Sequence, residues 1–125
     1  MKKGALIFWL LVLTIVVAGL GLAFAPNLLP SKLDSFAQCL KDKNATFYGA
    51  YWCPHCQRTK QMFGSAAHLL PYVECSTADG KGQTQICKDK GIVGYPTWVF
   101  ADGSKLEGEH TLDELAKASG CTLPQ

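Results

Sequence analysis

The hydrophobic pattern divides the chain into a long apolar start and a longer mixed remainder. After two lysines, residues 5–25 carry no charge and a single polar side chain, Thr14. A helix of that length spans roughly 30 Å, the thickness of the hydrocarbon core of a bilayer. The pattern therefore predicts a transmembrane helix over residues 1–25, with a linker over residues 26–31.

A cleaved secretory signal is the alternative for this segment, because Ala23-Phe24-Ala25 has the small-x-small pattern of a cleavage site. The apolar run is longer than a signal core, and Pro26 is an awkward residue after a scissile bond. Both interpretations export the remainder. Because positive charges stay on the cytoplasmic side, we expect a single-pass protein of the cell membrane whose domain is extracytoplasmic.

The remainder alternates between helical and strand-like patterns. Apolar residues recur three and four positions apart in some segments, and short apolar or aromatic runs between turn residues form the others. Helices alternating with strands predict an α/β fold, with a central mixed β-sheet flanked by helices on both faces. In order, the predicted elements are helix 31–43, strand 45–52, helix 54–70, strand 72–75, helix 84–90, strands 97–100 and 105–109, and helix 111–120.

Charge and cysteine content narrow the classes of function. From Pro26 onward ten basic residues balance ten acidic ones, so there is no basic surface for nucleic acid. The chain has six cysteines, a high count for 125 residues. In an exported domain that count indicates disulfides, whereas in a reducing cytosol it would indicate metal binding.

Two cysteines lie where the first predicted strand runs into a helix, in the sequence Cys53-Pro54-His55-Cys56. Unpaired backbone N–H groups and the positive end of the helix dipole favour a thiolate at this position. His55 can add positive charge, and Pro54 suits a first helical turn. The second sulfur lies one turn away, so we assign Cys53 as the nucleophile and Cys56 as the resolving cysteine.

A zinc site is the alternative for these cysteines, with Cys75 and Cys87 completing four thiolates. Such sites usually present two closely spaced pairs, whereas Cys75 and Cys87 are twelve residues apart. We therefore predict no metal. The sequence also lacks a phosphate loop, a dinucleotide fingerprint and a haem-attachment motif, so we expect no cofactor.

The active-site segment resembles that of thioredoxin-fold proteins. The residues Phe47-Tyr48-Gly49-Ala50-Tyr51-Trp52 precede the cysteine pair, and Gly94-Tyr95-Pro96-Thr97 is similar to the cis-proline loop of the family. The resemblance extends over about residues 32–120, within a domain assigned to residues 32–121. It implies that Pro96 follows a cis peptide bond and faces the cysteine pair, and that Tyr95 offers backbone hydrogen bonds to the substrate. We also expect Trp52 to border the site, with packing only in the core as the alternative.

The Cys-Pro-His-Cys motif is similar to that of DsbA-type disulfide oxidases. The stretch from Phe47 through Glu74-Cys75 to Tyr95-Pro96-Thr97-Trp98 resembles the thioredoxin-like domain that partners bacterial vitamin K epoxide reductase homologues. One departure from the family concerns Phe47. Thioredoxin-type proteins often place a buried acid there, six residues before the first cysteine, so the proton acceptor for Cys56 is not identified by the motif.

The four remaining cysteines are expected to be structural. A bridge between Cys75 and Cys87 would close the polar loop between them, although a second redox pair that relays electrons is the alternative. In the thioredoxin fold the end of the first helix and the end of the last lie on the side of the sheet away from the active site. Cys39 and Cys121 could meet there.

The function expected from these features is that of a membrane-attached thiol–disulfide oxidoreductase. It would oxidise cysteines of exported proteins and be reoxidised by a quinone-reducing membrane protein similar to vitamin K epoxide reductase. Two alternatives remain open at this point: an anchored reductase with the opposite electron flow, and a non-catalytic binding module stabilised by zinc or a disulfide.

Overall fold

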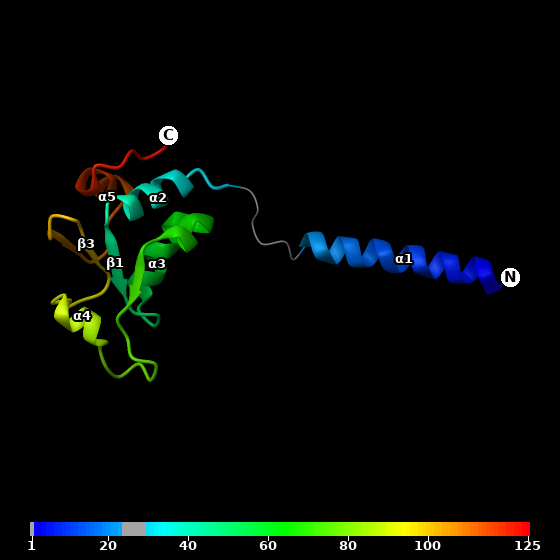
Figure 1. Cartoon of the computed structure of the whole chain (residues 1–125), viewed down its shortest axis with the longest axis horizontal. Coiled ribbons are helices and arrows are strands. Elements are labelled where there is room, and N and C mark those ends of the chain that lie inside the picture. Colours follow the sequence, from blue (N-terminus) through cyan, green and yellow to red (C-terminus); the bar gives the residue numbers. More distant parts are fainter. Residues whose placement is uncertain (1, 24–29) are drawn as a thin grey trace.

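The computed structural model describes residues 2–23 and 30–125. The first described part is the helix α1 (Lys2–Ala23), and the second is an α/β domain that contains all six cysteines (Figure 1). The predicted linker 26–31 lies mostly outside the described residues, as do the ends of the predicted anchor at residue 1 and residues 24–25.

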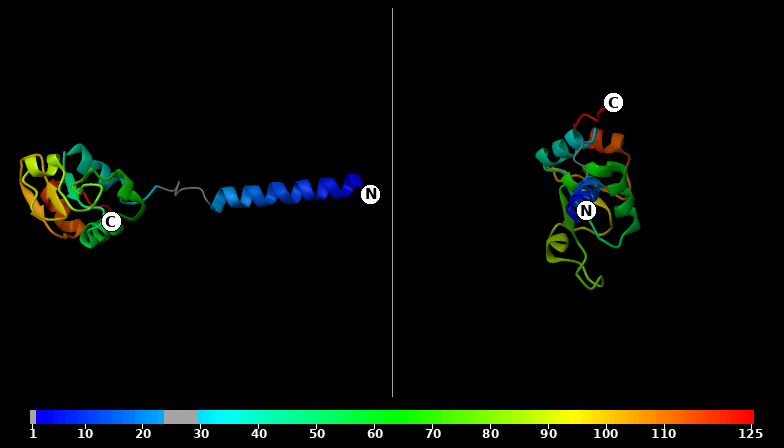
Figure 2. Two further views of the ribbon diagram at one scale, coloured as in Figure 1. Left: turned by 90° about the horizontal axis from the view of Figure 1, so that it is seen from below. Right: turned by 90° about the vertical axis from the view of Figure 1, so that its right-hand side faces the viewer.

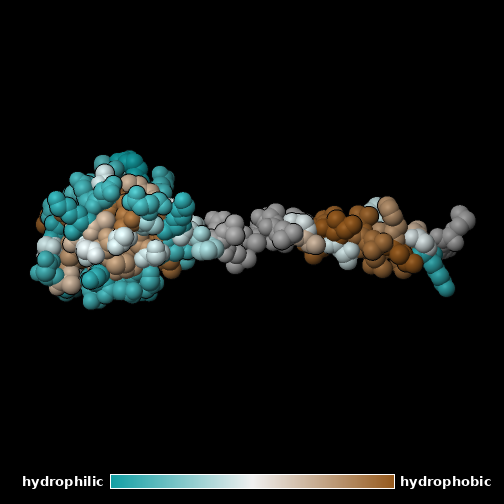
Figure 3. Space-filling view, turned by 90° about the horizontal axis from the view of Figure 1, so that it is seen from above, coloured by the Kyte–Doolittle hydropathy of each residue, from teal (hydrophilic) through white to brown (hydrophobic). Residues whose placement is uncertain are grey.

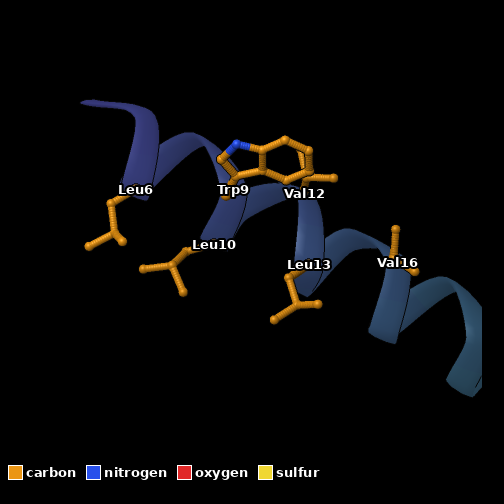
Figure 4. Close-up of a pocket in the computed structure, with 6 residues that line it drawn as sticks. All are labelled: Leu6, Trp9, Leu10, Val12, Leu13 and Val16. Atoms are coloured by element: carbon orange, nitrogen blue, oxygen red, sulfur yellow. The ribbon is translucent and has the colours of Figure 1, made fainter. Parts of the chain in front are cut away.

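Helix α1 exposes its large apolar side chains, which are between 50% and 70% accessible from Leu6 to Val17, except for the partly buried Val12. Figure 3 shows this helix as mostly brown, whereas the visible face of the domain is largely teal around a paler centre. Leu6, Leu10 and Leu13 project from one edge of the helix, and Trp9, Val12 and Val16 project from the other (Figure 4). Within the described residues, however, no helix combines the length and apolarity needed to cross a membrane. The predicted transmembrane helix is therefore not confirmed.

Four strands form one mixed sheet in the order β2-β1-β3-β4. The strand β1 (Thr46–Gly49) pairs in parallel with β2 (Tyr72–Glu74) and antiparallel with β3 (Thr97–Val99), and β4 (Lys105–Glu107) pairs antiparallel with β3. Three of the four residues of β1 are buried, as a central strand covered on both faces requires. The predicted α/β fold with a mixed sheet is confirmed.

Helices cover the sheet and enclose an aromatic core. Phe36 of α2 (Asp34–Asp42) stacks on Phe63 at the end of α3 (Pro54–Phe63), with ring centroids 5.8 Å apart. Trp98 of β3 is fully buried and stacks on Phe47 at 4.9 Å. This layer holds α3 against the middle of the sheet. The other helical elements are η1, a 3-10 helix (Gly64–Leu69), α4 (Gln85–Asp89) and α5 (Leu112–Ser119).

The predicted helix 54–70 is broken at its centre. Gly64 has a φ of +55°, outside the range of an α-helix, and the chain continues from there as the 3-10 helix η1. Met62 lies in the last turn of α3 before this break and points outward, with 38% of its surface exposed. The last helix begins with a capping box, in which the side chains of Thr111 and Glu114 each accept a hydrogen bond from the backbone N–H of the other.

Two disulfide bonds close the domain. Cys39 of α2 is bonded to Cys121 beyond α5, and these two helices lie next to each other in both Figure 1 and Figure 2. Cys75 is bonded to Cys87 of α4, and both residues are fully buried. The bonds are the two pairings expected from the sequence, and they leave Cys53 and Cys56 as free thiols.

We predict unequal contributions of the two disulfides to stability. Cys39 and Cys121 are 82 residues apart, so their bond stabilises the fold by about 4–5 kcal/mol through restriction of the unfolded chain. Cys75 and Cys87 are 12 residues apart, which corresponds to about 3 kcal/mol. Replacing each pair with alanine avoids a buried hydroxyl. Urea unfolding should show the larger loss for the Cys39–Cys121 pair, and an equal or smaller loss would contradict the chain-entropy explanation.

Candidate active site

The cysteine pair lies at the junction of β1 and α3. Cys53 is the N-cap of α3 with extended backbone dihedrals (φ −78°, ψ 118°), and Pro54 occupies the first helical turn. The Cys53 N–H donates to the Ala50 carbonyl oxygen at 3.0 Å, which closes the turn after the strand. The sulfur of Cys53 thus stands at the end of a helix where backbone N–H groups have no intrahelical acceptor. This geometry favours an anionic sulfur.

A cis peptide bond between Tyr95 and Pro96 lies opposite the first cysteine. The Cys53 thiol donates a hydrogen bond to the Tyr95 carbonyl oxygen, with 3.6 Å between sulfur and oxygen. Hydrogen bonds from Thr97 Oγ1 to the Gly94 carbonyl oxygen and from the Gly108 N–H to the Pro96 carbonyl oxygen fix this loop, each at 2.8 Å. The segment predicted as a substrate-binding loop therefore contacts the predicted nucleophile.

Trp52 forms part of the rim of the site. Its indole N–H donates to Ser76 Oγ at 2.9 Å, and its ring packs edge-on against Tyr95 with the centroids 6.1 Å apart. About half of its surface remains exposed. Trp52 and Tyr95 thus present aromatic surface beside Cys53, where a bound chain would pass.

Both cysteines are buried, with 1% of the surface of Cys56 and 4% of that of Cys53 exposed. Burial raises the pKa of the Cys56 thiol to about 12, against the opposing effect of a backbone hydrogen bond at Ala50. A Cβ atom on Gly49 would lie 2.9 Å from the Cys56 sulfur, so only glycine lets the strand approach this closely. The side chain of Phe47 is buried against Trp98 and offers no proton acceptor. The thiol of Cys56 is therefore held neutral by its surroundings.

His55 makes contacts that the sequence did not reveal. Its Nδ1 pairs with a carboxylate oxygen of Glu109, which lies in the segment between β4 and α5. Arg58, one turn further along α3, donates to the same oxygen from Nε at 2.8 Å. Its Nη2 lies 2.7 Å from His55 Nδ1. The three side chains form a charged group on the rim of the site, which we call the His55–Arg58–Glu109 cluster.

The cluster changes the electrostatic role expected of His55. Hydrogen bonds from Arg58, and then from His55, hold the pKa of the Glu109 carboxyl below its ordinary value, and Glu109 in turn raises the pKa of Arg58. The negative charge of Glu109 opposes the positive charge that His55 would add near Cys53. Arg58 favours an ionised Cys53, because attraction between these two charges also contributes to the raised Arg58 pKa.

Several residues of this site could not be found from the sequence. Arg58 follows His55 by three positions on the same helix, and that spacing was the only available signal for it. Glu109 is 54 residues from His55 and is brought to it by the β3–β4 hairpin, which no local pattern encodes. Lys60 and Tyr72 also border Cys56 and were likewise missed.

The zinc alternative does not fit the arrangement of cysteines. Cys75 and Cys87 are bonded to each other and cannot supply thiolate ligands beside Cys53 and Cys56. Their complete burial also separates them from any incoming thiol, which favours the structural role over the relay of electrons. Among residues 2–23 and 30–125 no group of three or more potential metal ligands is brought together.

Comparisons with known proteins agree with this geometry. A family model described as Thioredoxin matches residues 29–119. Thiol-disulfide oxidoreductase LTO1 of Arabidopsis thaliana is 44% identical over 95 residues, which cover 73% of this chain and 25% of that protein. The probable protein disulfide-isomerase ER-60 of Schistosoma mansoni is 31% identical over 113 residues, covering 82% of this chain and 22% of the relative.

A third relative, the protein disulfide-isomerase erp38 of Neurospora crassa, is 29% identical over 119 residues. The match covers 82% of this chain and 32% of that relative. The chain spans about a third or less of the length of each of these relatives. The match nevertheless includes the strand, the cysteine pair and the proline loop described above. The chain belongs to the thioredoxin family, and its domain is of the thiol–disulfide oxidoreductase class.

Proposed function

We propose that the chain is an extracytoplasmic thiol–disulfide oxidoreductase that oxidises cysteine pairs of exported proteins. The observation that carries this proposal is the pairing of a helix-capping Cys53 with a buried Cys56 beneath the cis Tyr95–Pro96 loop. In that arrangement Cys53 contacts the loop expected to hold an incoming chain, and Cys56 lies beside Gly49 of the strand.

The reaction begins with the Cys53–Cys56 disulfide of the oxidised domain. A substrate thiolate attacks Cys53 Sγ, the bond between the two cysteines breaks, and its electron pair passes to Cys56 Sγ, which then takes a proton. A second substrate thiolate attacks the first substrate sulfur, so that the substrate leaves with a disulfide and Cys53 leaves as a thiolate. The substrate is oxidised by two electrons, and the domain is reduced by two.

An oxidising direction is supported by the groups that favour a thiolate at Cys53. A stabilised thiolate stabilises the reduced form, and a more stable reduced form makes the oxidised pair a stronger oxidant. The N-terminus of α3, Arg58 and a protonated His55 all act in this direction. The similarity of the Cys-Pro-His-Cys motif to DsbA-type oxidases supports the same direction.

Reoxidation requires an electron acceptor outside the domain. We propose that this acceptor is a quinone-reducing membrane protein similar to vitamin K epoxide reductase, as the resemblance of the segment from Phe47 to Trp98 implies. The acceptor would draw electrons through a disulfide exchange at Cys53, the sulfur that contacts the Tyr95–Pro96 loop.

The location outside the cytoplasm is also part of the proposal. It is supported by the Cys39–Cys121 and Cys75–Cys87 disulfides, since such bonds are rare in reducing compartments. Attachment to a membrane is supported by the run of exposed apolar side chains on α1. This attachment would keep the domain near a membrane-bound electron acceptor.

The opposite direction of electron flow is the second candidate, and one observation favours it. Glu109 places a negative charge against His55 and Arg58, and this charge weakens the stabilisation of a Cys53 thiolate. With weaker stabilisation the couple would lie closer to a reductase such as thioredoxin. The reduction potential decides between the candidates.

We predict a reduction potential about 50–100 mV above the value near −270 mV of thioredoxin, because the helix end and Arg58 stabilise the reduced form. The potential should be measured on the detergent-solubilised full chain by equilibration with glutathione at known ratios, with the free thiols counted by alkylation. A potential below about −250 mV would favour the reductase candidate.

We also predict that Glu109→Gln raises this potential, by about 10–20 mV for groups as exposed as these. Removing the carboxylate leaves the positive charges of His55 and Arg58 free to stabilise Cys53, so alkylation of Cys53 should also extend to lower pH. Glu107→Gln is the matched control, because Glu107 lies two positions away on β4 and makes no side-chain contact with the cluster.

If Glu109→Gln and Glu107→Gln changed the reduction potential equally, the His55–Arg58–Glu109 cluster would have no specific effect on the Cys53–Cys56 couple. Replacing His55 with an uncharged residue should have the opposite effect and lower the reduction potential. An unchanged potential in the His55 variant would remove the physical basis for assigning a tuning role to this residue.

A further inference from the structure

The exchange reaction requires a negative charge on the buried Cys56, and the burial of this sulfur does not stabilise such a charge. In either direction of exchange Cys56 must carry a negative charge for a moment, as a leaving group or as an attacking thiolate. Its burial opposes that charge, and the nearby position 47 holds a phenylalanine where thioredoxin-type proteins often have an acid. A cation close to Cys56 would lower the free energy of the charged state.

Lys60 lies in the right place to provide this cation. It follows Cys56 by four positions on α3, so the two side chains lie on the same face of the helix, one turn apart. The Lys60 ammonium sits over the ring of Tyr72, with Nζ 3.5 Å from the ring centroid, which is the geometry of a cation–π interaction. The flexible lysine side chain is thereby held in one place.

The ring of Tyr72 also reaches the cysteine. A Cβ atom placed on Gly49 would lie 2.9 Å both from Tyr72 Cε2 and from Cys56 Sγ, so these two atoms lie on either side of one small gap beside the strand. The Tyr72 ring therefore lies next to both the Lys60 ammonium and the Cys56 sulfur. This packing is possible because β1 has a glycine at position 49.

We propose that Lys60 is a positioning residue for the exchange reaction, which stabilises the transient Cys56 thiolate from its fixed place over the ring of Tyr72. The proposal rests on the proposed function, since it concerns the second sulfur of the same pair. The electrostatic effect of Lys60 has the required sign, because it lowers the otherwise raised pKa of Cys56.

The other charged and titratable groups around Cys56 do not replace Lys60. Cys53 raises the pKa of Cys56, and burial raises the pKa of the Tyr72 phenol, which remains neutral. The Glu74 carboxylate accepts hydrogen bonds from the Tyr72 hydroxyl at 2.7 Å and from the backbone N–H groups of Tyr51 and Ser76. Its charge is thus directed toward these donors, and Lys60 is the cation that favours an ionised Cys56.

The step in which Lys60 acts is the cleavage of the Cys53–Cys56 bond. As an incoming thiolate forms its bond to Cys53 Sγ, the electron pair of the breaking bond moves to Cys56 Sγ and negative charge develops there. Lys60 stabilises that charge until Cys56 takes a proton from water. In the reverse reaction the same thiolate attacks the mixed disulfide at Cys53, so Lys60 assists both directions equally.

The experiment compares Lys60→Met with Lys60→Arg in the full chain. Methionine keeps the length of the side chain without its charge, and arginine keeps a cation that can lie over an aromatic ring. Rapid-quench alkylation would follow reduction by glutathione and oxidation by glutathione disulfide at pH 7. Lys60→Met should slow both rates roughly three- to fivefold, as a poorer thiolate leaving group implies, and Lys60→Arg should restore them.

The reduction potential at pH 7 provides the readout that separates this role from a structural one. Cys56 is protonated in the resting reduced domain, so losing Lys60 should slow both rates without shifting the equilibrium. Lys41→Met, an exposed lysine on α2, is the control for the loss of one positive charge and should leave the rates unchanged.

Wild-type rates in Lys60→Met would overturn the inference and leave the proposed function intact. Equal slowing in Lys60→Met and Lys60→Arg would indicate packing in place of charge and would also overturn it. If the wild-type chain itself exchanged no thiols with glutathione, the proposed function would fail, and the role of Lys60 would fail with it.

Discussion

The close approach of α3 to the end of β1 is the constraint on which the rest of the site depends. Gly49 has no side chain, so the buried strand can pass directly beside the Cys56 sulfur, and the chain turns within a few residues into a helix that begins at Pro54. A larger residue at position 49 would meet both this sulfur and the ring of Tyr72. Because the approach is close, Cys56 lies against the strand, while Cys53 contacts the Tyr95 carbonyl oxygen.

The two cysteines are both buried, but their different surroundings give them different chemistry. Cys53 caps a helix, contacts the Tyr95 carbonyl oxygen and lies near Arg58, all of which are compatible with a thiolate that exchanges with other chains. Cys56 is surrounded by apolar groups that keep its thiol neutral, so it reacts mainly with the sulfur beside it. We propose that the charges of the His55–Arg58–Glu109 cluster adjust the redox equilibrium of the pair and that Lys60 adjusts only its rate of exchange.

The sequence predicted the sheet, the helices and the cysteine pair because these features have local signatures. Alternating patterns, the capping box at Thr111 and the placement of Cys53 after a buried strand are all encoded within a few residues. The break at Gly64 was missed because a single glycine within an amphipathic pattern is compatible with a continuous helix. The cis bond before Pro96 was predicted only through the family resemblance, since such bonds are rare.

The cluster around His55 shows what local patterns leave out. Glu109 reaches His55 through the β3–β4 hairpin, and Tyr72 reaches Lys60 because β2 lies parallel to β1. Both contacts follow from the tertiary arrangement of the sheet. They change the expected role of His55 from an isolated positive charge to one member of a cluster that contains an opposing negative charge.

The central claim is that Cys53 is the sulfur that exchanges with other molecules and Cys56 is the buried sulfur that resolves the product. Intact-mass spectrometry of two full-chain variants, each incubated with glutathione disulfide, tests this most directly. Cys56→Ala should form a glutathione adduct at Cys53 at least about ten times faster than Cys53→Ala forms one at Cys56, because the buried thiol stays protonated. Equal rates, or a faster adduct at Cys56, would contradict the account.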